Sequence, residues 1–315
     1  MTVSFKNVID RYLAIIEDEM ARIDSYQSVP LFYDPIHYML DLKGKRIRPL
    51  LTLLSAMTFG AKAEEAKYAA AAVELLHNFT LVHDDIMDKD ATRRGKPTIH
   101  TKWDIGTAIL AGDGLMGLSF RKLLQAPRGD IPAMMGRLTE TMIVICEGQG
   151  LDKMFENMED VPLDAYLDMI ARKTAVLIEM ACELGGMAAE ADADFIQTLK
   201  AYGYALGMGF QIQDDYLDIT ADESILGKKI GSDLQMHKKT ILTILLRELT
   251  GSNDFFNLSL SDFKKLMEEY KIPDRVKQMY SDYFKTAYEK LALLPPNDHA
   301  LQLKELTDFL KNRSW

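Results

Sequence analysis

The chain has 315 residues, of which 48% are hydrophobic and 27% charged, as is typical of a folded globular protein. Its formal net charge of −10 argues against a nucleic-acid-binding protein, which would usually present a basic face. The two cysteines, Cys146 and Cys182, predict no disulfide framework, and we interpret both as small buried side chains in a reducing compartment.

The first 20 residues form an amphipathic stretch that becomes acidic at Glu17, unlike the apolar core of a signal peptide. No run approaches the roughly 18 apolar residues that a membrane span needs. The alanines at 69–72, for example, are soon followed by Glu74. We therefore expect a soluble, cytoplasmic protein.

Helical periodicity dominates the chain, and no convincing set of alternating strands is found. The ten prolines, Pro35 among them, are interpreted as markers of element boundaries. Pro49 is predicted to open a helix that ends at Gly60. The next helix is predicted from Ala63 to about Asp88, over residues rich in Ala, Leu and Glu. No proline occurs from Leu163 to Ile272, which permits several long helices in succession.

The sequence GKRIRP at 44–49 is a compact cationic loop directly before a predicted helix. Its Lys and Arg side chains can bind a phosphate group through charge-assisted hydrogen bonds. A solvated basic turn would have the same sequence pattern. The loop lacks the GxxxxGK[ST] pattern of a P-loop, so nucleotide hydrolysis has no support.

The sequence DDIMD at 84–88 returns as DDYLD at 214–218. In each copy the first and last carboxylates lie on one face of a helix, about one turn apart. Such carboxylates would repel one another without a cation, and Mg²⁺ usually binds through a few carboxylates plus the phosphates of a substrate. The repeat therefore predicts a Mg²⁺-dependent diphosphate site. Its candidate ligands are Asp84, Asp88, Asp214 and Asp218.

His77 shares the stripe of the first acidic pair, with Thr80 beside it, and Gln211 shares the stripe of the second. Asp85 and Asp215 point about 100° away, where they would support the ligands indirectly or act as helix-end charges. A solvated acidic helix end is the plain alternative for one copy. Two copies, each on an apolar helix and followed by a basic loop, favour the diphosphate site.

Together these residues resemble the trans-prenyltransferases, the all-helical isoprenyl diphosphate synthases. The parts appear in the family's order over 44–240: GKRIRP, LVHDDIMD followed by RRG, a Lys-Thr pair, and FQIQDDYLD followed by GKKIGSD. The resemblance implies an all-α fold, in which residues 1–315 form a single large helical bundle of the isoprenoid synthase type. Both acidic helices would line its central active-site cavity. A homodimer is the family's usual state.

The resemblance also implies a role for each matching residue. The predicted contacts to the diphosphate of isopentenyl diphosphate, the nucleophilic substrate, are Lys45, Arg48, His77 and Arg94. The predicted ligands of two or three Mg²⁺ ions are Asp84, Asp88, Asp214 and, through water, Asp218. The predicted contacts to the allylic diphosphate or its developing cation are Arg93, Lys173, Thr174, Gln211, Lys228 and Lys238. Among these, the candidate catalytic residues are Lys173, Thr174, Gln211 and Lys228.

Several positions have a second interpretation. Without the resemblance, Lys173 would be assigned as a solvated helix lysine and His77 as a packed core histidine. His237 stands where the family usually has glycine, so the backbone before Lys238 is expected to differ. The segment 311–315 is less basic than many family tails, which leaves its role in closing the site open.

The implied reaction is ionisation, condensation and elimination. Diphosphate leaves the allylic substrate (dimethylallyl, geranyl or farnesyl diphosphate), the double bond of isopentenyl diphosphate attacks the cation, and a proton is lost. Product length is expected to depend on a tunnel whose floor residues are Phe79 and Thr80. A lone Phe there resembles the archaeal-type geranylgeranyl diphosphate synthases and favours a twenty-carbon product. An ideal helix places Phe79 about 140° from Asp84, so an ordinary core aromatic is the alternative.

Other functions compete with this prediction. A farnesyl or longer-chain synthase would differ only in the tunnel. A terpene cyclase would need no binding site for a second diphosphate and usually replaces the second acidic motif. A non-catalytic subunit commonly loses one motif, whereas this chain keeps both. A generic helical metal-binding protein would leave the Lys and Arg sets unexplained.

Overall fold

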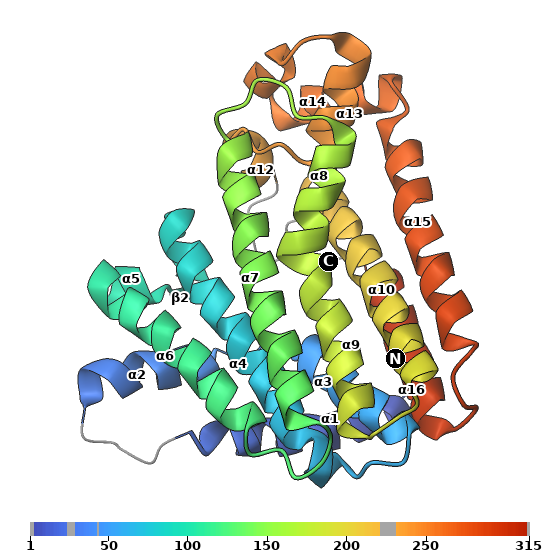
Figure 1. Ribbon diagram of the computed structural model, residues 1–315. Helices are drawn as coiled ribbons and strands as arrows, with labels where there is room; N and C mark the ends of the chain where they lie inside the picture. The colour runs from blue at the N-terminus through green and yellow to red at the C-terminus, as the bar shows by residue number, and fades with distance from the viewer. Residues whose placement is uncertain (1–2, 24–28, 43, 221–230, 314–315) are drawn as a thin grey trace. The chain divides into compact units, whose positions relative to one another are not determined.

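The computed structural model describes residues 3–23, 29–42, 44–220 and 231–313. Within these ranges the chain is almost entirely helical (Figure 1), which confirms the predicted all-α class. The helices are α1 (Val3–Ala21), α2 (Pro30–Asp41), α3 (Ile47–Thr58), α4 (Ala63–Met87), α5 (Ile99–Lys102), α6 (Ile105–Leu123), α7 (Ile131–Phe155), α8 (Leu163–Ile170), α9 (Val176–Ala188), α10 (Ala193–Thr220), α12 (Ser232–Gln235), α13 (Ile241–Thr250), α14 (Leu260–Glu269), α15 (Ile272–Leu291) and α16 (Asp298–Lys311). A π-helical turn, η1 (Ala171–Ala175), joins α8 to α9, and a 3₁₀ turn, η2 (Asp254–Asn257), precedes α14. Strands β1 (Thr92–Arg93) and β2 (Lys96–Pro97) pair antiparallel in a short hairpin.

The predicted helix starts are largely confirmed. Helix α4 spans Ala63–Met87, and Pro49 lies in the first turn of α3, where its missing N–H costs nothing. The interpretation of Pro35 as a boundary was wrong, because this residue is buried inside α2. Its ring removes one hydrogen bond early in the helix, to the carbonyl of Leu31. The packing of the buried face of α2 holds the helix together despite that loss.

Contacts divide the chain into two compact units. The first unit comprises residues 1–140, 180–199 and 294–305, and the second comprises 141–179, 200–293 and 306–315. The first acidic motif belongs to the first unit and the second motif to the second unit. That residues 1–315 form a single domain remains a prediction.

In the first unit, α4 packs against α1, α3 and α6. Its alanines at 69–72 are fully buried, and their small side chains let the neighbouring helices approach closely. Glu65 accepts a hydrogen bond from the backbone N of Lys62 (2.8 Å), which satisfies one of the open amides at the helix start. This buried, well-capped helix carries the first acidic motif at its far end.

In the second unit, the core gathers around α8, α10, α13, α14 and α15, with Tyr166, Ile212, Leu245 and Phe263 among its most buried members. Cys182, assigned to the first unit, is buried as predicted, whereas Cys146 on α7 is exposed, so the prediction of burial was wrong for Cys146. The presence of a small apolar side chain in a helix does not by itself show whether that position is buried or exposed.

No helix in the described ranges combines the length and hydrophobicity needed to cross a lipid bilayer.

Candidate functional site

The first acidic motif lies where α4 ends. The backbone N of Asp88 donates to the carbonyl of Asp84 at 2.8 Å, so the two residues stand one helical turn apart, as predicted. Both side chains are partly buried. Their carboxylate oxygens are hard donors of the kind that Mg²⁺ takes.

The neighbouring Asp85 is only 3% exposed and forms an ion pair with Arg93. Its Oδ1 accepts a hydrogen bond from Nε of Arg93 at 2.7 Å, and Nη2 of Arg93 lies 2.6 Å from the same oxygen. Burial opposes the charge of Arg93, but the hydrogen bond and charge of Asp85, together with the charges of Asp84 and Asp90, raise the pKa of Arg93 above its ordinary value. Asp85 therefore supports the motif indirectly, by binding the RRG loop, and is not a solvated helix-end charge.

Arg94 reaches back to the GKRIRP loop. Arg94 and Gly95 form the turn between β1 and β2 with φ values of 52° and 73°, as a tight hairpin requires. Nη1 of Arg94 donates to the carbonyl of Leu42. A Cβ atom at Gly44 would lie 2.5 Å from Nη2 of Arg94, so the glycine leaves space for the guanidinium. The fold thus joins two basic sequences that lie about fifty residues apart.

The cations of the GKRIRP loop separate in the structure. Arg46 is 4% exposed and points inward, where Nη1 donates to Oε1 of Glu74 at 2.7 Å and Nη2 to the carbonyl of Leu40 at 2.6 Å. The solvated-turn interpretation is therefore wrong for Arg46, whose charge the buried Glu74 neutralises. Lys45 is exposed, in contrast. No local pattern indicates the pair with Glu74, which comes from the middle of α4.

Arg48 binds His77 directly, with 3.1 Å between Nη1 and Nε2. Burial lowers the pKa of His77 well below its ordinary value, and nearby positive charge lowers it further. A neutral imidazole that accepts from arginine at Nε2 carries its own proton on Nδ1. The arginines whose charges act on His77 are Arg48, Arg94, Arg93 and Arg46.

The two predicted chain-length residues differ in their surroundings. Phe79 is 7% exposed and packs edge-on against His83, with 4.9 Å between ring centroids. His83 in turn lies over Gly112, so this side of α4 faces α6. Thr80 is partly buried and donates to the carbonyl of His77 at 2.8 Å. A tunnel that ended at Phe79 would therefore run between α4 and α6.

The second acidic motif lies near the end of α10. Asp214 is exposed and forms an ion pair with Arg313 (3.1 Å), while Asp218 is partly buried. Asp215 is 8% exposed, and its Oδ2 accepts from the hydroxyl of Tyr166 at 2.6 Å. As in the first motif, the second Asp is an interior group.

Gln211 connects the second motif to the Lys-Thr pair. Its Oε1 accepts from Oγ1 of Thr174 at 2.9 Å, and its Nε2 donates to Oδ1 of Asp215 at 2.7 Å. These two bonds fix which end of the amide is the oxygen. Thr174, Gln211 and Asp215 therefore form one connected chain within the second unit.

Lys173 and Thr174 lie in the π-helical turn η1. Such turns often occur at functional sites, because the extra residue redirects side chains that a regular helix would hide. Gly148 of α7 packs against this turn, since a Cβ there would lie 2.4 Å from the backbone N of Lys173. Nζ of Lys173 donates to Oδ2 of Asp152 at 2.6 Å, so the solvated-lysine interpretation does not hold.

The remaining allylic-side residues are Lys238, which is partly buried, and Lys228, which lies outside the described residues. Before Lys238, His237 has a φ of 54° and stacks on Phe256, with 4.8 Å between centroids and an interplanar angle of 25°. His237 thus adopts a backbone conformation that favours glycine, and the stacking holds it there.

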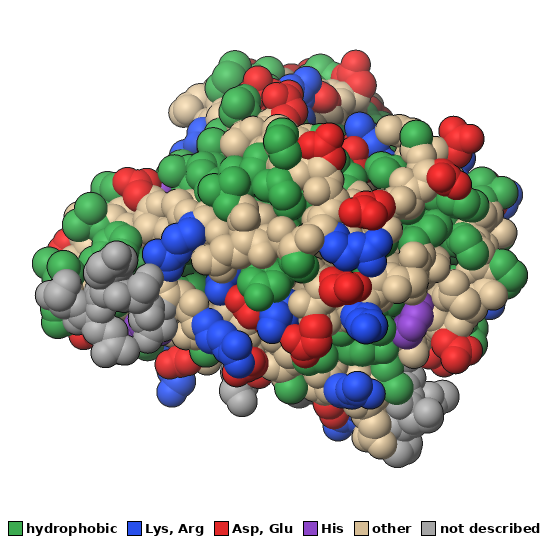
Figure 2. Space-filling model, turned by 60° about the horizontal axis from the view of Figure 1, so that its bottom comes forward, with side chains coloured by type: hydrophobic (Ala, Val, Ile, Leu, Met, Phe, Trp, Pro, Cys, Tyr) green, Lys and Arg blue, Asp and Glu red, His purple; other side chains and the backbone are tan. Residues whose placement is uncertain are grey.

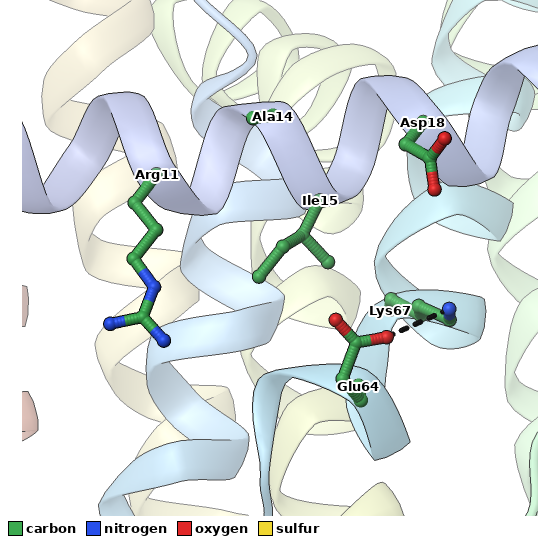
Figure 3. Close-up of a pocket in the computed structure, with 6 residues that line it drawn as sticks. All are labelled: Arg11, Ala14, Ile15, Asp18, Glu64 and Lys67. Carbon is green, nitrogen blue, oxygen red and sulfur yellow. Dashed lines mark ion pairs between the residues drawn. The ribbon is translucent and has the colours of Figure 1, made fainter.

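One hollow on the described part of the surface lies away from the predicted site residues. A hollow of 390 Å³ in the first unit, between α1 and α4 (Figure 3), is lined by Arg11, Ala14, Ile15, Asp18, Glu64 and Lys67. Lys67 and Glu64, which both belong to α4, form an ion pair at 2.8 Å in this lining. On the face shown in Figure 2, acidic and basic side chains are interspersed, without a large area of one sign. In the described part of the chain, no three His, Cys, Asp or Glu side chains converge on one point.

The family model described as polyprenyl synthetase matches residues 29–280 of the chain. The chain belongs to the polyprenyl synthetase family. It is 44% identical over 238 residues to a geranylgeranyl diphosphate synthase of Sulfolobus acidocaldarius, covering 74% of this chain and 72% of the relative. It is 35% identical to a geranylfarnesyl diphosphate synthase of Natronomonas pharaonis, covering 96% and 95%. The crystal structure of a geranylgeranyl pyrophosphate synthetase from Pyrococcus horikoshii superimposes with a TM-score of 0.92 at 32% identity, covering 98% of this chain and 99% of the other.

The polyprenyl synthetase match includes the GKRIRP loop and both acidic motifs. The prediction of a trans-prenyltransferase is thereby confirmed at the level of the family. Two sets of polar contacts are therefore candidates for a function in this polyprenyl synthetase. One is the arginine group around His77, and the other is the hydrogen-bonded chain of Thr174, Gln211 and Asp215.

Proposed function

We propose that the chain is a geranylgeranyl diphosphate synthase, which condenses isopentenyl diphosphate with dimethylallyl, geranyl or farnesyl diphosphate. The arginine group around neutral His77 is the observation that carries this proposal. Arg46 and Arg93 are neutralised by Glu74 and Asp85, whereas Arg94 donates to a backbone carbonyl. A guanidinium that donates to a neutral acceptor keeps its charge available for a diphosphate.

Arg48 and His77 extend this anion site. Arg48 binds a neutral acceptor, the imidazole of His77, and the Nδ1 proton of His77 would provide a further donor. Together with Lys45 and Arg94, these groups would bind the diphosphate of isopentenyl diphosphate. A terpene cyclase would have no use for such a second diphosphate site.

The acidic pairs fit Mg²⁺ by the chemistry of their donors. Asp84, Asp88 and Asp214 would hold two or three ions, with Asp218 acting through water. When bound, the ions would neutralise negative charge on the diphosphate that leaves. The metal requirement and the ion count are part of this proposal.

The second unit supplies the contacts for the allylic substrate. Lys173, Lys228 and Lys238 would bind its diphosphate as it departs. Gln211, fixed by Thr174 and Asp215, would present its carbonyl dipole to the developing cation, a preorganised stabilisation. Exclusion of water would protect that cation until the double bond of isopentenyl diphosphate attacks it.

The twenty-carbon product rests on Phe79 as the tunnel floor and on the geranylgeranyl synthases among the relatives. A twenty-five-carbon product is the alternative, favoured by the geranylfarnesyl synthase relative. A homodimer also belongs to this proposal. Ile105, Ile109 and Leu110 on α6 are 57%, 44% and 49% exposed, which supports a covered face there.

The condensation itself is tested by comparing Asp84→Asn with Asp113→Asn, a matched change at an exposed position on α6. Each purified chain is incubated with isopentenyl diphosphate, an allylic diphosphate and Mg²⁺. Because the metal contributes several kcal/mol, we expect Asp84→Asn to slow condensation at least about a hundredfold. Asp113→Asn should retain the wild-type rate. Equal rates in the two variants would contradict the proposal.

A further inference from the structure

Arg313 is a charged residue that is 9% exposed, two positions after the last residue of α16. Its guanidinium is held by α10: Nη2 donates to the carbonyl of Phe210 at 2.8 Å, and Nε donates to Oε1 of Gln213 at 3.1 Å. The guanidinium carbon also lies 3.7 Å from the centroid of the Phe210 ring. These contacts place Arg313 without any help from Asp214.

Gln213 joins this arrangement to α16. While its Oε1 accepts from Arg313, its Nε2 donates to the carbonyl of Lys311 at 2.8 Å. Gln213 is 3% exposed, so both ends of its amide are satisfied in the interior. The segment after α16 is therefore fixed on the helix that carries the second acidic motif.

The fixed guanidinium then reaches Asp214. Nη2 of Arg313 lies 3.1 Å from Oδ1 of Asp214, whose side chain is 52% exposed. The ion pair engages one of the two carboxylate oxygens. The buried guanidinium lies on one side of this carboxylate and solvent lies on the other. The carboxylate therefore points in one defined direction.

Anchoring of α16 does not by itself explain the ion pair. The hydroxyl of Tyr202 bonds Oγ1 of Thr307 at 2.8 Å, and the hydroxyl of Tyr288 donates to Oδ1 of Asp308 at 2.5 Å. These two bonds already attach α16 to α10 and α15. The contact between Arg313 and Asp214 is therefore expected to affect the carboxylate of Asp214 itself.

We propose that Arg313 is a positioning residue for Asp214, which holds Oδ1 so that the other oxygen is presented to a divalent cation. This inference rests on the proposed function, in which Asp214 binds the metal. Residues that orient a metal ligand typically change metal affinity by about 10–100-fold when removed. The positive charge of Arg313 alone would weaken cation binding, so the sign of the change separates positioning from charge.

The test measures Mn²⁺ binding to the full chain by electron paramagnetic resonance, with inorganic pyrophosphate present and no turnover. Arg313→Gln removes the charge and keeps a similar side-chain length. We expect it to weaken Mn²⁺ binding about tenfold. Lys311→Ala is the matched control, because it removes a cation of the same segment whose Nζ lies 5.5 Å from the Tyr288 ring centroid. It should leave Mn²⁺ affinity unchanged.

The Asp214→Asn variant separates the metal role of Asp214 from the positioning role of Arg313. If Asp214→Asn does not weaken Mn²⁺ binding, the metal role of Asp214 in the proposed function fails, and the positioning role with it. If Asp214→Asn weakens binding but Arg313→Gln leaves it equal or tighter, only the positioning role is overturned. In the double variant, Arg313→Gln should add no further loss to that of Asp214→Asn.

A second variant covers the case in which Arg313→Gln does not fold. Arg313→Lys keeps the charge but loses the planar fork that reaches the Phe210 carbonyl, Gln213 and Asp214 together. It should also weaken Mn²⁺ binding. Wild-type affinity in folded Arg313→Lys would overturn the positioning role.

Discussion

Arg48 and His77 share a hydrogen bond of 3.1 Å in which the imidazole accepts, so the histidine of the first acidic helix works as a neutral group. Its low pKa follows from burial and then from the surrounding arginines. A protonated His77 would add a fifth positive charge to this group. The Arg48–His77 pair should therefore make the stability of the folded protein depend on pH.

We expect stability to fall as the pH is lowered below about 6.5, the ordinary pKa of histidine. In that range the unfolded chain binds a proton at His77 and the folded chain does not, so protonation favours unfolding. His77→Gln should reduce this slope by up to about 1.4 kcal/mol per pH unit. The measurement is urea unfolding at pH 7.5 and 5.5, with His299→Gln on α16 as the control. An unchanged slope in His77→Gln would contradict the assignment.

Gly44→Ala should displace Arg94 with little effect on folding. The new Cβ would meet only the far end of a flexible side chain, at 2.5 Å from Nη2. Since a charge-assisted hydrogen bond is worth about 1.5–3 kcal/mol, we expect the KM for isopentenyl diphosphate to rise about tenfold or more. The KM for the allylic substrate should stay within about twofold, by the same reasoning. Gly117→Ala, at a position with open space around it, should change neither KM.

Gly148→Ala should be far more damaging, because the new Cβ would meet backbone atoms. It would lie 2.4 Å from the N of Lys173 and 2.8 Å from the C of Arg172, both in the π-helical turn. Overpacking of this kind costs about 1–3 kcal/mol, and the shifted turn should also lower kcat. Gly150→Ala on the same helix faces open space and should stabilise the protein by up to about 1 kcal/mol. Thermal and urea unfolding of the two variants would show the contrast, and similar values for both would refute it.

Phe79→Ser should lengthen the products by opening the space between α4 and α6. Phe79→Leu keeps an apolar side chain at the same position and should retain the wild-type length. Mass spectrometry of the products decides between them. Unchanged lengths in a folded, active Phe79→Ser enzyme would mean that Phe79 is an ordinary core aromatic.

Features that depend on a single helix could be predicted from the sequence. The one-turn spacing of Asp84 and Asp88 and the position of Asp85 about 100° away follow from a period of 3.6 residues, and the bounds of α4 follow from a stretch rich in Ala, Leu and Glu. Partners that come from other elements did not follow. Arg46 was grouped with its basic neighbours, yet it binds Glu74, and nothing near Asp214 in the chain indicates Arg313. Such pairs depend on tertiary packing, which a local pattern does not contain.

The single measurement that tests the central claim most directly is the size of the product. The purified chain is incubated with isopentenyl diphosphate, Mg²⁺ and, in turn, dimethylallyl, geranyl and farnesyl diphosphate, and the products are sized by mass spectrometry. We predict a dominant twenty-carbon diphosphate from each primer. A dominant product of fifteen, or of twenty-five or more, carbons would keep the chemistry but contradict Phe79 as the floor. No condensation with any primer, from folded protein, would contradict the proposed function.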